Sequence, residues 1–257
     1  MEKDNKGLWI AAAAAVSLAV AFGFYRRFAA PPPTMPAPSV SSAAQSVPPP
    51  SAPASSPLPS LDQSDGLARQ AAQALFTGAR LGDWLQTEGL LRRLTAAVAM
   101  IGEGKSPREA LSFLQPGKKF KFKTQGGKIF IDPASYRRYD RVADVVGSLD
   151  AQAAAKTIGE LRPLFQQACG ELDARCDFQA ALLSAIKVLL KTPIVAGEIR
   201  LRKKVLSFAM ADEALESLSP VQKQLLRMGP DNEAKVQAKL RELALALGSR
   251  PDELPRP

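Results

Sequence analysis

The sequence predicts a mainly α-helical protein with an N-terminal transmembrane helix, a Pro/Ser/Ala-rich linker and a helical bundle domain that contains one small β-hairpin. Three observations underlie this prediction: an uncharged apolar run near the N-terminus, a proline-rich segment after it, and apolar residues at helical spacing beyond about residue 63. We expect the chain to divide into a cytoplasmic head at 1–7, a transmembrane helix at 8–25, a disordered linker at 26–62, a helical domain at 63–250 and a tail at 251–257.

The apolar run Leu8–Phe24 has the length of a membrane span. Its 17 residues reach about 26 Å as a helix, which just crosses the hydrocarbon core of a bilayer. Trp9 and Tyr25 stand at its two ends, where aromatic rings favour the membrane interface. A cleaved signal peptide with the small-x-small site Ala19-Val20-Ala21 is the alternative, but the apolar run continues beyond that site. We therefore favour an anchor.

Orientation rests on weaker signals, because two lysines before the run are matched by two arginines after it. The seven-residue head is typical of a signal anchor, and the paired cysteines suit an oxidising compartment. We expect a cytoplasmic N-terminus and an exported C-terminal domain.

The segment 28–61 predicts a spacer. Its 34 residues contain no charge or glycine and include 11 Pro, 8 Ser and 7 Ala, a composition that cannot bury enough apolar surface to fold. The alternative is a Pro-rich ligand for a groove-binding domain, although no basic motif flanks it.

The domain itself reads as a series of helices. Pro163 falls inside one of them and predicts a kink, because its ring opposes the carbonyl of Gly159. The segment 178–191 is apolar on nearly all sides, which predicts the centre of the bundle. Asp231 or Asn232 is expected to cap the last helix. The expected helices cover 90–101, 132–149, 150–172, 178–191, 219–228 and 231–247.

One segment, 119–131, predicts a β-hairpin. Its lysines and phenylalanines alternate, Gln125-Gly126-Gly127 supplies a turn, and a second apolar run returns. We expect Phe120 and Phe122 to pack on a helix. The opposite face would carry three lysines, either to prevent edge-to-edge strand pairing, which we favour, or to contact head groups or an acidic partner. These lysines are Lys119, Lys121 and Lys123.

Composition excludes much catalytic chemistry. The chain has no His and 2 Cys, so histidine triads, His-ligated zinc and a four-thiolate zinc site are ruled out. A carboxylate-based glycan hydrolase would need a pair of acids. Glu160, Glu198 and Glu216 are candidates, but no spacing among them marks a pair. We predict no catalytic, cofactor or metal site and no enzyme activity.

The charge balance points to an anionic partner. The chain carries a net charge of +9, of which +7 lies in residues 62–257. An exported basic domain meets anionic lipid or envelope polymer before nucleic acid, for which no recognition motif is present.

Cys169 and Cys176 are the possible disulfide. On an unbroken helix they would stand about 10.5 Å apart, too far for a bond. Asp173-Ala174-Arg175 reads as a turn that would bring them together. A disulfide and two free thiols both remain open.

Three segments resemble a bacterial domain of unknown function: Ile131–Asp140, Lys204–Ala209 and Leu225–Asn232. The resemblance extends over about residues 65–248 and implies a single-pass membrane protein with a short N-terminus, a Pro/Ala-rich stretch and a helical C-terminal domain. It implies no activity, and it does not include the cysteine pair. Within these segments Arg137 and Arg227 are candidate contact residues, with helix starts and stops as the structural alternative.

Together these observations predict a single-pass protein of the bacterial inner membrane with a periplasmic domain. We expect a non-catalytic interaction or scaffold domain that binds another envelope protein. A binding module for anionic lipid or polymer is the alternative. Trp84 is expected to be a buried anchor of the domain, with an exposed interface position as the other interpretation.

Overall fold

The computed structural model describes residues 58–76, 81–114 and 116–256. The predicted head, transmembrane helix and nearly all of the linker lie outside the described residues. Within the described ranges, no helix combines the length and the hydropathy that a membrane span requires.

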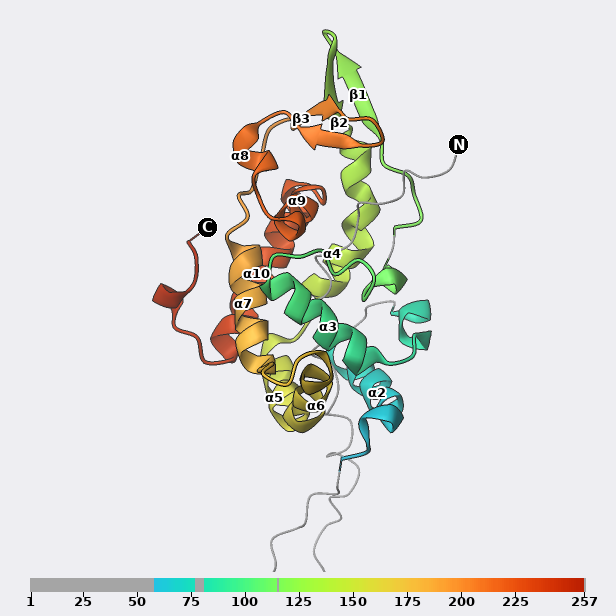
Figure 1. Cartoon of the computed structure of the whole chain (residues 1–257), viewed down its shortest axis with the longest axis vertical. Coiled ribbons are helices and arrows are strands. Elements are labelled where there is room, and N and C mark those ends of the chain that lie inside the picture. The colour runs from blue at the N-terminus through green and yellow to red at the C-terminus, as the bar shows by residue number, and fades with distance from the viewer. Residues whose placement is uncertain (1–57, 77–80, 115, 257) are drawn as a thin grey trace, which may run out of the picture.

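The described chain is mainly helical, as predicted, and carries a small antiparallel sheet at one end (Figure 1). Helix α3 lies against α6 and α7, while α10 crosses α4, α5 and α7. The helices are α2 (Asp65–Leu75), α3 (Leu90–Gly102), α4 (Asp140–Gly147), α5 (Ala151–Glu160), α6 (Arg162–Leu172), α7 (Phe178–Leu190), α8 (Glu213–Glu216), α9 (Pro220–Leu226) and α10 (Pro230–Ala246).

Helix α7 lies in the core, as its apolar surface predicts. Leu182, Ile186 and Leu189 are completely buried between α7 and its neighbours. The stacked rings of Phe165 and Phe178, with centroids 4.4 Å apart, join α6 to the start of α7. Gln179, Ala180 and Ser184 are exposed, so a narrow side of α7 faces solvent while neighbouring helices cover its apolar sides.

Two predicted helices are interrupted. The helix expected over 150–172 is not merely kinked at Pro163: α5 ends at Glu160 and α6 begins at Arg162. Proline has no N–H to donate to Gly159 and its ring opposes that carbonyl, so the chain begins a new helix with Pro163 in its first turn. Similarly, the segment opened by Asp132 forms a 3₁₀ helix at Pro133–Tyr139 before α4.

The predicted hairpin is half of a four-stranded sheet with strand order β1-β2-β3-β4, all antiparallel. Gly126 and Gly127 form its turn with φ values of +56° and +71°, as a two-residue turn of type I′ requires. The strands are β1 (Phe122–Gln125), β2 (Lys128–Ile131), β3 (Arg200–Lys203) and β4 (Phe208–Met210).

The phenylalanines of the hairpin share a strand residue as their aromatic partner, where the prediction expected an α-helix. The rings of Phe120 and Phe122 lie 6.0 Å and 4.8 Å from the ring of Phe208 at the start of β4. The second pair of strands supplies the apolar surface that the prediction assigned to a helix. A second, smaller core forms there, from Ile131, Ile199, Leu201, Met210 and Leu226.

Close contacts at the start of α10 connect the helices to the segment that follows β2. Gly229, not Asp231 or Asn232, is the residue before the helix, and its φ of +84° favours glycine. A Cβ atom on Gly229 would lie 2.4 Å from Cγ of Tyr136. The Asn232 side-chain amide donates to the carbonyl of Tyr136 (3.2 Å) and to Asp140 (2.9 Å). Two of the three segments that carry the family resemblance thus meet at this joint.

Candidate anion-binding site

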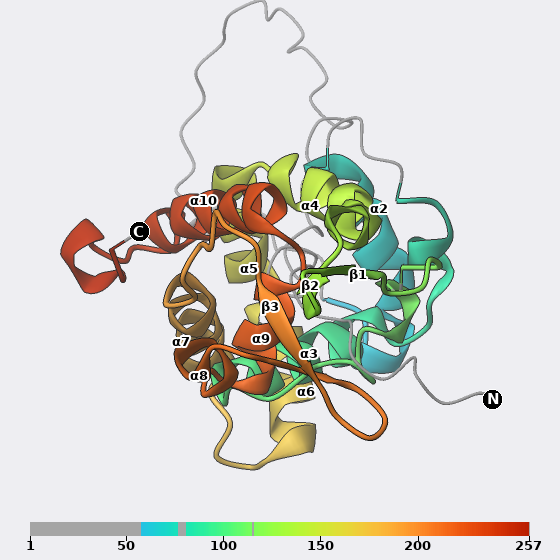
Figure 2. The same cartoon turned by 90° about the horizontal axis from the view of Figure 1, so that it is seen from above.

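The excess of basic over acidic side chains in the domain lies on the two hairpins. Residues 118–131 and 198–210 together carry nine basic and one acidic side chain, whereas the rest of residues 62–257 carries 21 basic and 22 acidic ones. The two hairpins therefore carry a net charge of +8 and the rest of residues 62–257 a net charge of −1, so the sheet end accounts for the whole basic excess. Both hairpins belong to one sheet, so this charge is gathered in one region of the molecule (Figures 1 and 2).

Ser135 and Arg138 hold the lysine-rich segment before β1 against the 3₁₀ helix. The backbone N–H of Lys121 donates to Ser135 Oγ (2.6 Å), and this hydroxyl donates to the carbonyl of Lys121 (2.7 Å). Arg138 donates from Nε to the carbonyl of Ser135 (2.9 Å) and from Nη1 to that of Lys118 (3.1 Å). Five basic side chains are thereby brought close together.

These side chains line a hollow of about 160 Å³, which we call the basic hollow. No acidic residue contributes to its lining, and its size suits a phosphate or carboxylate group together with part of the molecule that carries it. The residues that line it are Lys118, Lys119, Lys121, Ala134, Arg137 and Arg138.

Arg138 lines the hollow and is almost fully buried. Its guanidinium lies over the rings of Phe120 (5.6 Å) and Tyr139 (5.4 Å), and burial lowers the pKa of Arg138 below its ordinary value. Among the described residues its Nη2 atom finds no hydrogen-bond partner. A buried donor without a partner is costly.

A second basic surface continues from the hollow along the sheet. The pairing register places Lys123, Phe130, Arg200 and Arg202 on one face; we call this the basic sheet face. Lys123 forms an ion pair with Glu198, the one acid of the two hairpins. Arg200 and Arg202 are exposed.

The structure separates the five predicted contact residues into three groups. Lys119, Lys121 and Arg137 line the basic hollow together. Lys123 lies on the basic sheet face. Arg227 belongs to neither, since it is half-buried behind α9, where its Nη1 donates to the carbonyl of Lys223 (3.4 Å) and burial lowers its pKa. The structure thus does not bring Arg227 together with the other four candidates, and its role in contacts stays a prediction.

Sequence reasoning missed four basic residues of this region: Lys118, Arg138, Arg200 and Arg202. A signal was present for the last two, because Arg200-Leu201-Arg202 alternates in the same way as the recognised hairpin. A strand of only four residues with one apolar member gives that pattern little weight.

The three candidate acids each have a basic partner of their own. Glu160 faces Lys156 (3.8 Å) and Glu198 pairs with Lys123. Glu216 accepts the N–H of Met210 (2.9 Å); burial would raise its pKa, but this hydrogen bond and the nearby lysines, Lys223 and Lys204, lower it below the usual value. In the described ranges no three His, Cys, Asp or Glu side chains are grouped as metal ligands.

Cys169 and Cys176 are joined by a disulfide with their Cα atoms 5.4 Å apart. Helix α6 ends at Leu172 and α7 begins at Phe178, so the turn expected at 173–175 separates the two cysteines.

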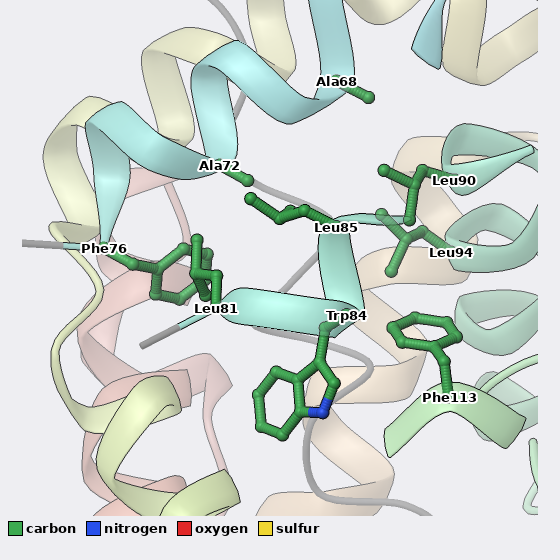
Figure 3. Close-up of a pocket in the computed structure, with 9 residues that line it drawn as sticks. All are labelled: Ala68, Ala72, Phe76, Leu81, Trp84, Leu85, Leu90, Leu94 and Phe113. Carbon is green, nitrogen blue, oxygen red and sulfur yellow. The ribbon is translucent and has the colours of Figure 1, made fainter. Parts of the chain in front are cut away.

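An apolar pocket between α2 and α3 is the other hollow of note, and Figure 3 shows its side chains. Trp84 lies at its edge, half-buried, with the guanidinium of Arg141 4.6 Å from its ring. The space inside is about 20 Å³, scarcely more than one water molecule needs. We interpret it as a packing gap.

Fold and site together define a small helical domain with an antiparallel basic sheet at one end. The chain belongs to the family described as "Protein of unknown function (DUF3014)", whose model matches residues 90–244. This confirms the predicted resemblance to a domain of unknown function, while the single-pass membrane architecture stays a prediction. No curated protein and no solved structure gave a match.

The packed domain extends beyond the matched residues. Leu61 and Leu75 before it and Leu254 after it are buried in the main core. Arg241 of α10 also donates to the carbonyl of Pro255 (2.7 Å), so the segment predicted as a tail contacts the domain.

Proposed function

We propose that this chain is a membrane-anchored, non-catalytic protein of the bacterial envelope, whose helical domain works by binding a macromolecule that presents phosphate or carboxylate groups. The observation that carries the proposal is the basic excess of the sheet end, next to a helical body with almost no net charge. Three lysines of the sheet end line the basic hollow together with two arginines of the adjacent 3₁₀ helix. Net charge spread evenly over a surface serves solubility, whereas charge gathered in one hollow favours binding of a counter-ion.

The membrane anchor is part of the proposal. The apolar run at 8–25 supplies it, and the Pro-rich spacer would let the domain reach a partner on the exported side. The two most common alternatives to catalytic histidine, clustered thiols and paired carboxylates, are used structurally in the described residues: the cysteines bond to each other and the candidate glutamates face lysines.

Salt-dependent retention on phosphocellulose tests the proposal. The full chain in detergent is compared with a triple variant of the hollow, Lys119→Gln with Lys121→Gln and Arg137→Gln. Arg138 stays unchanged because it holds the backbone together. The control variant removes the same charge from exposed positions of α5 and the α6–α7 region, by Lys156→Gln with Arg162→Gln and Arg175→Gln.

We expect the hollow variant to elute at clearly lower salt and the control variant to elute near the wild type. Equal losses from both variants would mean that only net charge matters, which contradicts the proposal. Loss of the cellular phenotype from a single Glu160→Gln, Glu198→Gln or Glu216→Gln change in a folded domain would instead favour the hydrolase alternative.

A further inference from the structure

The turn between β3 and β4 exposes two adjacent large apolar side chains. Val205 is 97% exposed and Leu206 is 71% exposed, more than any other large apolar side chain in the described residues. Single exposed apolar residues are common and need no explanation. Two adjacent exposed apolar side chains at the tip of a hairpin, in the most basic region of the domain, do call for an explanation.

The turn has a defined shape. The N–H of Lys204 donates to the carbonyl of Ser207 (2.8 Å) across it. At the base of the hairpin, Leu201 and Met210 are buried in the smaller core. Figure 2 shows this turn, in orange, projecting away from the helical body. Val205 and Leu206 are therefore presented at an extremity and not folded back on the domain.

The charged residues next to this tip along the chain are all positive. Arg202, Lys203 and Lys204 precede it, and no acidic residue occurs between Glu198 and Asp212. Lys204 Nζ lies 3.4 Å from a carboxylate oxygen of Glu216 of α8. The side chains of Arg202 and Lys203 are exposed to solvent. An apolar tip with a basic collar complements a surface that is apolar inside and negative outside, which describes an anionic bilayer.

We infer that the β3–β4 turn inserts Val205 and Leu206 into the interface of a bilayer that contains anionic lipid, while Arg202, Lys203 and the basic sheet face contact the head groups. The inference deepens the proposed function and rests on it for the electrostatic attraction. It names the bilayer as the surface that carries the phosphate groups. A protein groove that receives the tip is the competing occupant.

A fluorescent label next to the tip tests this inference. Because Cys169 and Cys176 are bonded to each other, Ser207→Cys gives the full chain one free thiol for an environment-sensitive dye and leaves both apolar side chains in place. The labelled protein is reconstituted into vesicles of phosphatidylcholine alone or mixed with phosphatidylglycerol. Emission wavelength and quenching by lipid-attached nitroxides are recorded. A label at Gln179→Cys, an exposed position at the start of α7, is the control.

We expect blue-shifted, quenched emission at position 207 only with phosphatidylglycerol, and no change at position 179. Adding Val205→Ser and Leu206→Ser should weaken the membrane-bound state on the order of tenfold or more, since two large apolar side chains no longer enter the interface. The same double change should leave elution from phosphocellulose unaltered.

Three outcomes would overturn the inference. Unquenched emission at position 207 in both kinds of vesicle means that the tip does not enter lipid, and a blue shift that persists in detergent assigns the tip to a protein contact. Equal quenching in phosphatidylcholine alone removes the need for anionic lipid. If the label at position 207 shows no lipid contact but the hollow variant still elutes at lower salt, the proposed function stands without this inference. If the label does contact lipid but the hollow variant elutes like the control variant, the proposed function is contradicted.

Discussion

The helical body and the sheet end of this domain differ in both charge and packing. The body has nearly equal numbers of acidic and basic side chains, and its core runs continuously from Leu61 to Leu254. The sheet end carries nine basic side chains against one acid and closes over a core of five fully buried residues.

This contrast separates stability from recognition. A large apolar core supplies most of the free energy of folding, so the sheet can keep like charges close together at an energetic cost that the body offsets. Tyr136, Gly229 and Asn232 join the two regions. Changes at the joint, in the body and in the sheet should therefore have effects of decreasing size on stability.

The largest effect is expected from Gly229→Ala at the joint. The added methyl group would overlap the Tyr136 ring, and the φ of +84° is strained for alanine. We expect a loss on the order of 3 kcal/mol or more in the free energy of unfolding, measured by urea denaturation. Gly159→Ala is the control: nothing lies within 4 Å of its Cβ position and it sits in α5, so stability should rise slightly. Wild-type stability of Gly229→Ala would show that the joint is not close-packed.

The second effect is a pH dependence of the free energy of unfolding that arises from Glu233, which is 1% exposed at the start of α10. Burial raises its pKa from 4.5 to about 8, so the folded protein keeps a proton that the unfolded chain releases in this interval. The free energy of unfolding should therefore fall by up to about 1.4 kcal/mol per pH unit as the pH rises from 4.5 towards 8.

Glu233→Gln should flatten this pH dependence, because the amide resembles the protonated acid and cannot ionise. Thermal melts between pH 5 and pH 9 would measure this pH dependence. Glu160→Gln, at an exposed position, should keep the wild-type slope. A wild-type slope in Glu233→Gln would assign the pH dependence to other groups.

A smaller effect is expected from the disulfide, which lies in the body at the turn between α6 and α7. Replacing both Cys169 and Cys176 by alanine should cost roughly 2–3 kcal/mol, the loop-closure value for so short a loop. Elution from phosphocellulose should not change, because the basic hollow belongs to the other region. Two free thiols in non-reducing mass spectrometry of the protein purified without reductant would contradict the bond.

The smallest effects are expected in the sheet. Phe122→Ser removes a ring that is 48% exposed but packs 4.8 Å from that of Phe208, so we expect a loss of about 1 kcal/mol. Lys121→Glu should change the melting temperature very little, since only the backbone of Lys121 is held by Ser135, yet it should lower retention on phosphocellulose. A large loss of stability from Lys121→Glu would show that its side chain supports the fold.

The sequence predicted the elements whose signals are local. The apolar surface of 178–191, the Ser219-Pro220 helix start and the Gly126-Gly127 turn depend on neighbours along the chain, and each is found. The break at Pro163 was located correctly, but its extent was underestimated, because whether a proline bends or divides a helix depends on how the two halves pack.

The candidate site was predicted only in part, because local sequence patterns do not determine which remote segments come together in space. Lys119, Lys121 and Arg137 were selected from two separate sequence patterns, and Arg227 from a third. Nothing in those patterns says that the first three share a hollow and the fourth does not. Strands β3 and β4 follow the first hairpin by some 70 residues, and their pairing with β2 is non-local.

The sequence by itself determined the helical class, the hairpin turn, the basic excess and the place of Gly229 in a family segment. Tertiary structure alone decided that two distant hairpins make one sheet, that Arg138 holds the lysine segment in place, and that Gly229 must accommodate the Tyr136 ring. Helix periodicity and turn chemistry act over a few residues and can be read along the chain. Charge density and steric contact depend on distances in space, which arise only when segments remote in sequence bury their apolar faces together.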